Sequence, residues 1–211
     1  MCFKEPMLVE PIPIPHCFTS MMQRLMITLD ERTQYGVIVI DMQEFFLRDI
    51  AERKALIANQ KAVLKVCAKQ DIPVLIVSYA PLTADDLPAG TLEKLSGGYW
   101  KPIPEIKEVV ADIPRASYFT KSSNSALSNA EVRKQLKSWN ITDICTLGVN
   151  TATCITESVE DALGMGYRVH SAKTLITDRK FRPEPDYQVF NHRDARLYEH
   201  HSELIVNLLL V

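Results

Sequence analysis

Short, continuous apolar runs constrain the fold of this chain more than any other feature. The first run is Gly36–Ile40, which is rich in β-branched residues, and the second is Val74–Val77. Three further runs follow along the chain, at residues 116–120, 143–147 and 167–170. Runs without polar alternation are typical of parallel strands that are buried on both faces of a sheet.

Segments with apolar residues at helical spacing separate these runs. They predict helices near residues 51–70, 104–111, 128–139, 152–164 and 185–200. Ser128 is the expected N-cap of the third helix, because Glu131 follows it by three residues. The apolar end of the chain, Leu204–Leu210, is predicted as a sixth strand, with a last helix as the alternative. Strand–helix alternation predicts an α/β sandwich of three layers, with a mostly parallel sheet between two layers of helices.

Composition and charge exclude several classes of protein. The 211 residues carry a formal net charge of −2 at pH 7, and 46% of them are hydrophobic. Nucleic-acid binding needs a clustered basic face, so we expect no nucleic-acid partner. No apolar stretch approaches the roughly 18 residues of a membrane span, so we expect no membrane partner either.

Cysteine usage points to a reducing compartment. Five cysteines stand at irregular spacing without a C-x-x-C pair, which argues against a disulfide framework or a zinc ribbon. Prolines interrupt the N-terminal apolar segment, so no export signal is expected. We therefore expect a cytoplasmic protein, with export by another route as the alternative.

The N-terminal segment differs from the rest of the chain. Residues 11–15 alternate proline and isoleucine, which favours an extended polyproline conformation. We expect residues 1–33 to form an arm that lies against the body or against a neighbouring subunit, with a mobile tail as the alternative. Residues 34–211 are expected to form the main domain.

An acid, a base and a thiol follow three of the predicted strands. Asp41 follows the first run, Lys121 the third, and Cys154 opens the helix after the fourth. Ligands of parallel α/β sheets bind beyond the carboxyl ends of the strands, where these side chains are expected to converge. A helix N-terminus and the Lys121 ammonium are expected to lower the pKa of the Cys154 thiol, and Asp41 to accept its proton. The plain alternative for Cys154 is a small buried side chain.

Three segments resemble motifs of the isochorismatase-like cysteine hydrolases. They are Val37–Phe46, Lys121–Leu127 and Gly148–Ala162, and they occur in the family's order. The resemblance implies a Rossmann-like six-stranded parallel sheet and an Asp41–Lys121–Cys154 catalytic triad. It also implies a cis peptide bond between Val149 and Asn150, an oxyanion hole made by the N–H groups of Asn150 and Cys154, and dimers or tetramers.

Departures from the family pattern bear on the reaction. Nicotinamidases of this superfamily bind a metal through an aspartate and two histidines near the second strand. Here that strand is followed by Ser78–Pro81, so we expect no metal and no cofactor. Retention of Cys154 favours a small amide or ureide substrate, cleaved at its C–N bond through a thioester. The alternatives are vinyl-ether hydrolysis of isochorismate and a non-catalytic binding or assembly protein.

Four aromatic residues are candidates for the substrate pocket. Phe45 and Phe46 follow Asp41, while Tyr99 and Trp100 end a long connection after a Gly97–Gly98 pair. Packing at the edge of the core is the alternative for all four. A basic cluster, Arg179–Arg182, is interpreted as a solvated loop, with contact to an anionic substrate or a subunit as the alternative.

Overall fold

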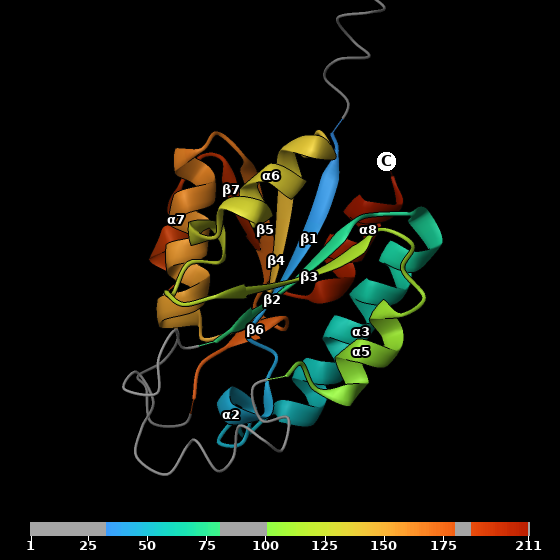
Figure 1. Cartoon of the computed structure of the whole chain (residues 1–211), viewed down its shortest axis with the longest axis vertical. Helices are drawn as coiled ribbons and strands as arrows, with labels where there is room; N and C mark the ends of the chain where they lie inside the picture. Colours follow the sequence, from blue (N-terminus) through green and yellow to red (C-terminus); the bar gives the residue numbers. More distant parts are fainter. Residues whose placement is uncertain (1–32, 81–100, 180–186, 211) are drawn as a thin grey trace, which may run out of the picture. The chain divides into compact units, whose positions relative to one another are not determined.

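Parallel strands form the centre of the structure, a computed structural model that describes residues 33–80, 101–179 and 187–210. Within these residues the sheet has seven strands in the order β3-β2-β1-β4-β5-β7, with β6 paired to β4 (Figure 1). All of these pairings are parallel. The strands are β1 (Tyr35–Ile40), β2 (Val74–Tyr79), β3 (Ala116–Lys121), β4 (Asp143–Val149), β5 (Arg168–Ala172), β6 (Ile176–Thr177) and β7 (Ala195–Tyr198).

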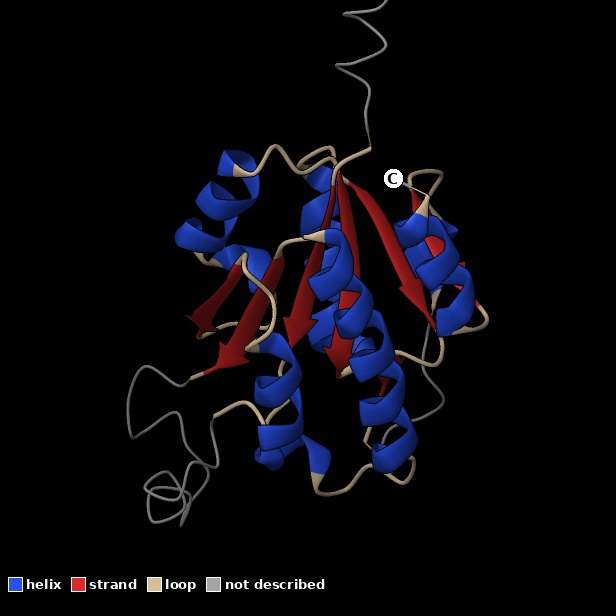
Figure 2. Cartoon of the chain, turned by 90° about the vertical axis from the view of Figure 1, so that its right-hand side faces the viewer, coloured by secondary structure: helices blue, strands red, loops and turns tan. Residues whose placement is uncertain are grey.

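Helices cover both faces of the sheet (Figure 1, Figure 2). One layer contains α3 (Arg53–Gln70), α5 (Pro104–Val110) and α8 (His201–Leu209). The other contains α6 (Ala130–Ser138) and α7 (Thr156–Gly164). Shorter turns complete the described chain: α2 (Glu44–Leu47), the 3-10 turns η2 (Ala126–Ser128) and η4 (Gln188–Asn191), and the π-turn η3 (Thr151–Ile155). The predicted three-layer α/β architecture is confirmed.

Strand β1 illustrates why the apolar runs became central strands. Val37 and Val39 pack into the core beneath α3, α5 and α8, whereas Ile38 and Ile40 pack into the core beneath α6 and α7. All six residues of the strand are buried. Successive side chains of a strand point to opposite faces, so a strand between two helical layers must be apolar at every position.

The prediction for the end of the chain is wrong. Residues 195–198 form β7, which pairs with β5 where a helix was expected, and α8 occupies Leu204–Leu209 where a strand was expected. Leu204 and Leu208 are fully buried and stand one helical turn apart, so the buried positions have helical rather than strand spacing. The start of α8 carries a capping box between His200 and Glu203.

The predicted N-cap of α6 is displaced by one residue. Asn129 caps the helix, because its side-chain oxygen accepts the N–H of Glu131 at 2.8 Å. Ser128 instead ends the preceding 3-10 turn, and its hydroxyl donates to the carbonyl of Ser125. The predicted capping box between Ser128 and Glu131 is therefore wrong, because the short turn ahead of the helix moves the cap to Asn129.

Some expectations lie outside the described residues. They concern residues 1–32 of the N-terminal arm, Tyr99 and Trp100, and the part of the basic cluster after Arg179. Thr33 begins the compact unit that contains all the described elements. Among the helices of the described chain, none has both the length and the apolar character of a membrane span.

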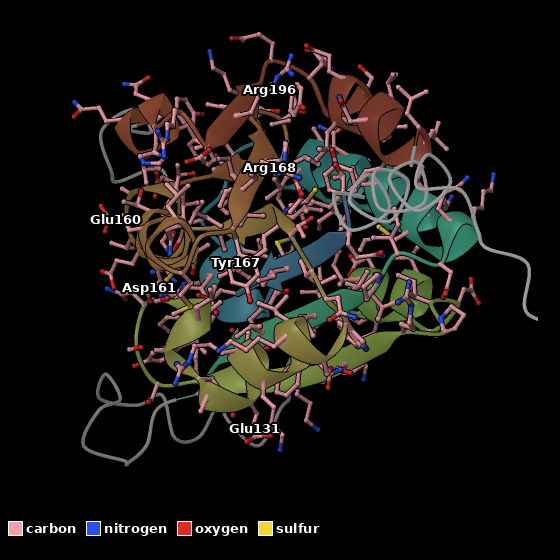
Figure 3. The ribbon with its side chains drawn as sticks, turned by 90° about the horizontal axis from the view of Figure 1, so that it is seen from above. Glu131, Glu160, Asp161, Tyr167, Arg168 and Arg196 are labelled. Carbon is pink, nitrogen blue, oxygen red and sulfur yellow. The ribbon has the colours of Figure 1, made fainter. Side chains whose placement is uncertain are left out.

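A buried carboxylate joins the first residues of β4 and β5, at the end of the sheet where the strands begin. Asp143 is 1% exposed, and its two oxygens accept hydrogen bonds from Arg168, labelled in Figure 3, at 2.8 and 2.5 Å. His170 and Thr142 contribute further bonds at 2.9 and 2.7 Å. Burial raises the pKa of Asp143, but the bonds from His170, Arg168 and Thr142 outweigh burial and leave the pKa below its usual value.

Gly148 should not tolerate a side chain. It adopts φ +133°, and an added Cβ would lie 2.0 Å from the carbonyl oxygen of Ile40 on the neighbouring strand. We expect Gly148→Ala to destabilise the fold by more than about 4 kcal/mol, or to prevent folding. The matched control is Gly164→Ala in α7, where an added Cβ meets nothing within 4 Å. This control should stabilise the helix by up to about 1 kcal/mol. Urea midpoints compare the two, and a Gly148→Ala protein with the wild-type midpoint would contradict the packing described.

Asp143 should make stability depend on acid pH. A carboxyl group whose folded pKa is depressed stabilises the fold fully above its unfolded pKa of about 3.9, and this contribution is lost as the pH falls through the folded pKa. Asp143→Asn should therefore cost about 2 kcal/mol at pH 7 and weaken the fall in stability below about pH 4. The exposed Asp112 provides a control as Asp112→Asn. Equal acid profiles for wild type and Asp143→Asn would refute this role.

Candidate active site

The strand order brings Asp41, Lys121 and Cys154 to one edge of the sheet. The chain runs outward from β1 through β2 to β3 and then returns to place β4 beside β1. This creates a switch point between β1 and β4, where parallel α/β sheets bind their ligands. Asp41 directly follows β1, Lys121 ends β3, and Cys154 lies in η3 just after β4.

Asp41 and Lys121 form an ion pair that is closed to solvent. The Nζ atom of Lys121 lies 2.8 Å from Oδ2 of Asp41, and both side chains are 0% exposed. The other carboxylate oxygen of Asp41 accepts the backbone N–H of Tyr79 at 2.8 Å. The Asp41 backbone has φ +53°, a left-handed conformation that aspartate tolerates better than most residues and that is enriched at functional sites.

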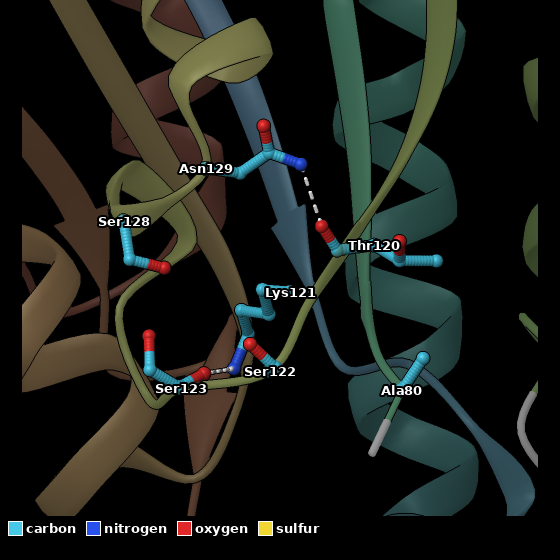
Figure 4. A pocket seen from close by; sticks show the side chains of 7 residues that line it. All are labelled: Ala80, Thr120, Lys121, Ser122, Ser123, Ser128 and Asn129. Atoms are coloured by element: carbon cyan, nitrogen blue, oxygen red, sulfur yellow. Dashed lines mark hydrogen bonds between the residues drawn. The ribbon is translucent and has the colours of Figure 1, made fainter. Parts of the chain in front are cut away.

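The Lys121 ammonium is held on three sides. Besides Asp41, it donates to the carbonyls of Ser123 at 3.1 Å and of Asn124 at 2.7 Å. Three acceptors use the full donor capacity of an ammonium group, which fixes its position. A cavity of about 350 Å³ lies next to this residue, and Figure 4 shows the side chains that line it. Apart from Ala80 the lining residues are polar: Thr120, Lys121, Ser122, Ser123, Ser128 and Asn129.

Cys154 lies close enough to Asp41 for the two groups to influence each other's pKa. The residue is 5% exposed, and its sulfur accepts a hydrogen bond from the Thr153 hydroxyl at 3.8 Å. It sits in the η3 turn, which follows a cis peptide bond between Val149 and Asn150. The cis bond expected from the family resemblance is therefore present. Both residues flanking it are buried, and the donors of the oxyanion hole stay a prediction.

The expected low thiol pKa is wrong. Burial, followed by the negative charge of Asp41, raises the pKa of the Cys154 thiol to about 11, and Lys121 only partly offsets this. The physical reason is that the Lys121 ammonium is already neutralised by Asp41, so a thiolate would be a second anion in a buried site. Cys154 therefore rests as a neutral thiol.

Burial raises the pKa of the Asp41 carboxyl group, while Lys121, Cys154 and the Tyr79 N–H act in the opposite direction. A raised pKa makes a carboxylate a stronger base than an exposed one, so Asp41 is the candidate acceptor for the proton of the nearby thiol. The arrangement can thus activate sulfur by proton transfer at the moment of attack.

Aromatic side chains extend from Lys121 to the predicted pocket residues. The Lys121 ammonium lies 5.6 Å from the Tyr79 ring centroid, and Tyr79 meets Phe46 edge to face at 6.1 Å. Phe46 in turn contacts Phe45 at 5.0 Å. The Arg179 guanidinium lies over both phenylalanine rings and donates to the carbonyl of Phe45 at 2.7 Å. Arg179 is thus packed against these rings rather than freely solvated, and the role of Phe45 and Phe46 in a substrate pocket stays a prediction.

Sequence reasoning missed residues that support the site without belonging to the triad. Gln43 is fully buried, and its side-chain amide pairs with both backbone groups of Tyr79, at 2.8 and 2.9 Å. Asp178 accepts the N–H of Ala152, in the turn that carries Cys154, at 3.1 Å. The position of Gln43, two residues after Asp41, was the available signal. The partner of Asp178 is 26 residues away, and no local pattern reveals it.

The described residues offer no ready metal centre. Across residues 33–80, 101–179 and 187–210, no group of three or more histidine, cysteine, aspartate or glutamate side chains is placed to hold a metal ion. The end of β2 presents Ser78 and Tyr79 rather than carboxylate or imidazole ligands. The cofactor-free reaction stays a prediction.

Comparison with known proteins now decides the family. The family model described as the isochorismatase domain matches residues 35–196. The chain belongs to the isochorismatase family. This match includes all three motif segments, Val37–Phe46, Lys121–Leu127 and Gly148–Ala162. A comparison with curated protein sequences gives no significant match.

Solved structures of this isochorismatase fold share the architecture at low sequence identity. The MAR1 ribonuclease of Caenorhabditis elegans has a TM-score of 0.67 at 17% identity, over 85% of this chain and 83% of that one. A nicotinamidase of Bacillus subtilis has a TM-score of 0.65 at 15% identity, over 79% and 100%. The N-carbamoylsarcosine amidase of Thermoplasma acidophilum has a TM-score of 0.63 at 16% identity, over 79% and 96%.

Removing the charge of Asp41 should activate the thiol while leaving it without a base. In Asp41→Asn the Lys121 ammonium loses its counter-ion, so the pKa of Cys154 should fall. Alkylation of Cys154 by iodoacetamide, followed by peptide mass spectrometry at pH 8, should be about tenfold faster than in wild type, equivalent to one pKa unit. Asp143→Asn, which removes a remote buried carboxylate, should leave the rate unchanged. Slower alkylation in Asp41→Asn would contradict this account.

Proposed function

We propose that the protein is a cofactor-free cysteine hydrolase that cleaves the C–N bond of a small amide or ureide. The buried ion pair between Asp41 and Lys121, 2.8 Å long and close to the Cys154 thiol, carries this proposal. It provides a nucleophile, a base within reach of its proton, and a cation that keeps the base ionised. Perturbed titratable groups of this kind cluster at functional sites.

The first half-reaction forms a thioester on Cys154. The sulfur attacks the substrate carbonyl carbon as its proton passes to the Asp41 carboxylate, and the carbonyl electron pair moves to oxygen. The N–H groups of Asn150 and Cys154 stabilise that oxyanion. Collapse of the intermediate breaks the C–N bond, and Asp41 returns the proton to the leaving nitrogen as ammonia or an amine departs.

The second half-reaction releases the acid. A water molecule attacks the thioester carbon while Asp41 takes its proton, and the C–S bond breaks. The proton then returns to sulfur, which restores the neutral thiol. Lys121 keeps Asp41 in place through both steps, because its ammonium is fixed by the carbonyls of Ser123 and Asn124.

The names of two structural relatives support a substrate that is cleaved at a C–N bond. Two of the structural relatives are named for acting on an amide or a carbamoyl compound. A thiol that attacks a carbonyl needs a base, which Asp41 supplies, whereas acid-catalysed hydrolysis of a vinyl ether needs no sulfur.

Three broader expectations belong to the same proposal. Residues 34–211 form the hydrolase domain, and residues 1–33 an arm in contact with the body or a neighbouring subunit. The protein is a homo-oligomer, either a dimer or a tetramer. It works in the cytoplasm on a small molecule, without nucleic acid or membrane as a partner.

Turnover should depend on both sulfur and carboxylate. With a panel of primary amides and N-carbamoyl amino acids, ammonia release identifies a substrate for wild type. Cys154→Ala should abolish turnover and Asp41→Asn should lower kcat by at least about 100-fold, because general-base catalysis contributes 10²–10⁴-fold. Both variants should keep the wild-type circular dichroism spectrum.

Two outcomes would point elsewhere. Full turnover by Cys154→Ala would exclude the thioester mechanism, and isochorismate cleavage that needs Asp41 but not Cys154 would favour the vinyl-ether reaction. Rapid mixing followed by acid quench provides a direct check, since wild type should show a covalent mass addition on Cys154 that hydroxylamine removes. An inert Cys154 in a folded protein would favour the binding or assembly alternative.

A further inference from the structure

Ser158 joins two segments of the site that are far apart in the sequence. It lies in α7, is 0% exposed, and its hydroxyl donates to the carbonyl of Cys154 at 2.5 Å. The same oxygen accepts the backbone N–H of Ala126 at 2.8 Å. A serine in a helix often returns its hydroxyl to the carbonyl four residues earlier and does nothing else. Here the second bond turns that local contact into a bridge between two loops.

The loop that contains Ala126 also holds the Lys121 ammonium. Ala126 follows Lys121 by five residues, and the Lys121 ammonium donates hydrogen bonds to the carbonyls of the intervening Ser123 and Asn124. The Asn124 side chain makes a second, outer link to α7, because it donates to Glu157 at 2.5 Å. The loop of residues 121–126 is thus hydrogen bonded to α7 at two adjacent residues, Glu157 and Ser158.

We propose that Ser158 is a positioning residue that sets Cys154 against the Asp41–Lys121 pair. This inference rests on the proposed function. The backbone carbonyl of Cys154 and the backbone N–H of Ala126 bond to the same hydroxyl group. A movement of the turn that carries the thiol therefore also moves the loop of residues 121–126, which holds the Lys121 ammonium. Ser158 itself touches none of the reacting atoms and acts through these two backbone groups.

The chemistry of a hydroxyl group suits this role. One O–H group offers a single donor and two acceptor lone pairs, which is what a carbonyl on one side and an N–H on the other require. Without it, the N–H of Ala126 and the carbonyl of Cys154 both lose their hydrogen bond to the Ser158 hydroxyl, and with it the link between the two loops. A displacement of about 1 Å at a reacting group can cost 100-fold in rate.

The test compares Ser158→Ala with Ser158→Thr, which keeps the hydroxyl, and with Ser171→Ala. Ser171 is the matched control, since it is also 0% exposed and its hydroxyl donates to the Thr146 carbonyl at 2.8 Å, within the sheet. Ser158→Ala should lower kcat by about 10- to 100-fold with little change in KM, and should slow Cys154 alkylation or shift its pH profile. Ser158→Thr should restore most of the activity. Ser171→Ala should lower the urea midpoint while kcat and the alkylation profile stay at wild-type values.

The outcomes separate this inference from the proposed function. Alkylation of Cys154 reports on the thiol without any substrate, so it can be read even if the amide panel yields no turnover. Wild-type kcat and alkylation in a folded Ser158→Ala protein would overturn the inference. If that variant does not fold, hydrogen exchange of wild type decides, because a bridged Ala126 amide should exchange as slowly as its buried neighbours. An Ala126 amide that exchanges at the rate of an exposed loop would also overturn it.

Discussion

The site depends on a charge pair from which water is excluded. Asp41 and Lys121 lie 2.8 Å apart with no exposed side-chain surface, so both ions have lost their hydration. Such a pair stabilises a fold weakly, because desolvation consumes most of the attraction between the charges. It persists here because the carbonyls of Ser123 and Asn124 and the N–H of Tyr79 replace the lost water. The neighbouring loops are therefore shaped around two charges, an arrangement that favours a functional role for the pair over a purely stabilising one.

The same pair determines how the sulfur is activated. A cation next to a cysteine usually favours a thiolate, but this cation is already paired, and burial with Asp41 raises the pKa of Cys154 to about 11. The resting thiol therefore keeps its proton, which also protects the sulfur from oxidation, because oxidation requires thiolate character. In the proposed reaction, attack coupled to proton transfer avoids a second buried anion.

The sequence was sufficient to predict features that follow from one physical rule acting over the whole fold. It was insufficient for features that depend on contacts between residues far apart in the chain. Runs such as Gly36–Ile40 must be central strands, and side chains after parallel strands must meet at one edge, so the convergence of Asp41, Lys121 and Cys154 followed. The thiol pKa did not follow, because it depends on whether the lysine charge is already neutralised. The C-terminal segment failed for a similar reason. Its apolar composition suits a strand, and only the packing of Leu204 and Leu208 beneath one face selects a helix.

Rigidity at this site comes from side chains that bond to the backbone of another loop. Gln43 holds both backbone groups of Tyr79, which in turn supplies the N–H that orients Asp41. Ser158 holds the carbonyl of Cys154 and the N–H of Ala126. Each link ties the segment of a proposed triad residue to a segment that follows a different strand. In the proposed reaction, a proton that passes between sulfur and carboxylate needs the two groups held in a fixed geometry. The parallel sheet brings the loops to the same edge, and these cross-loop bonds fix the loops relative to one another, as that proton transfer requires.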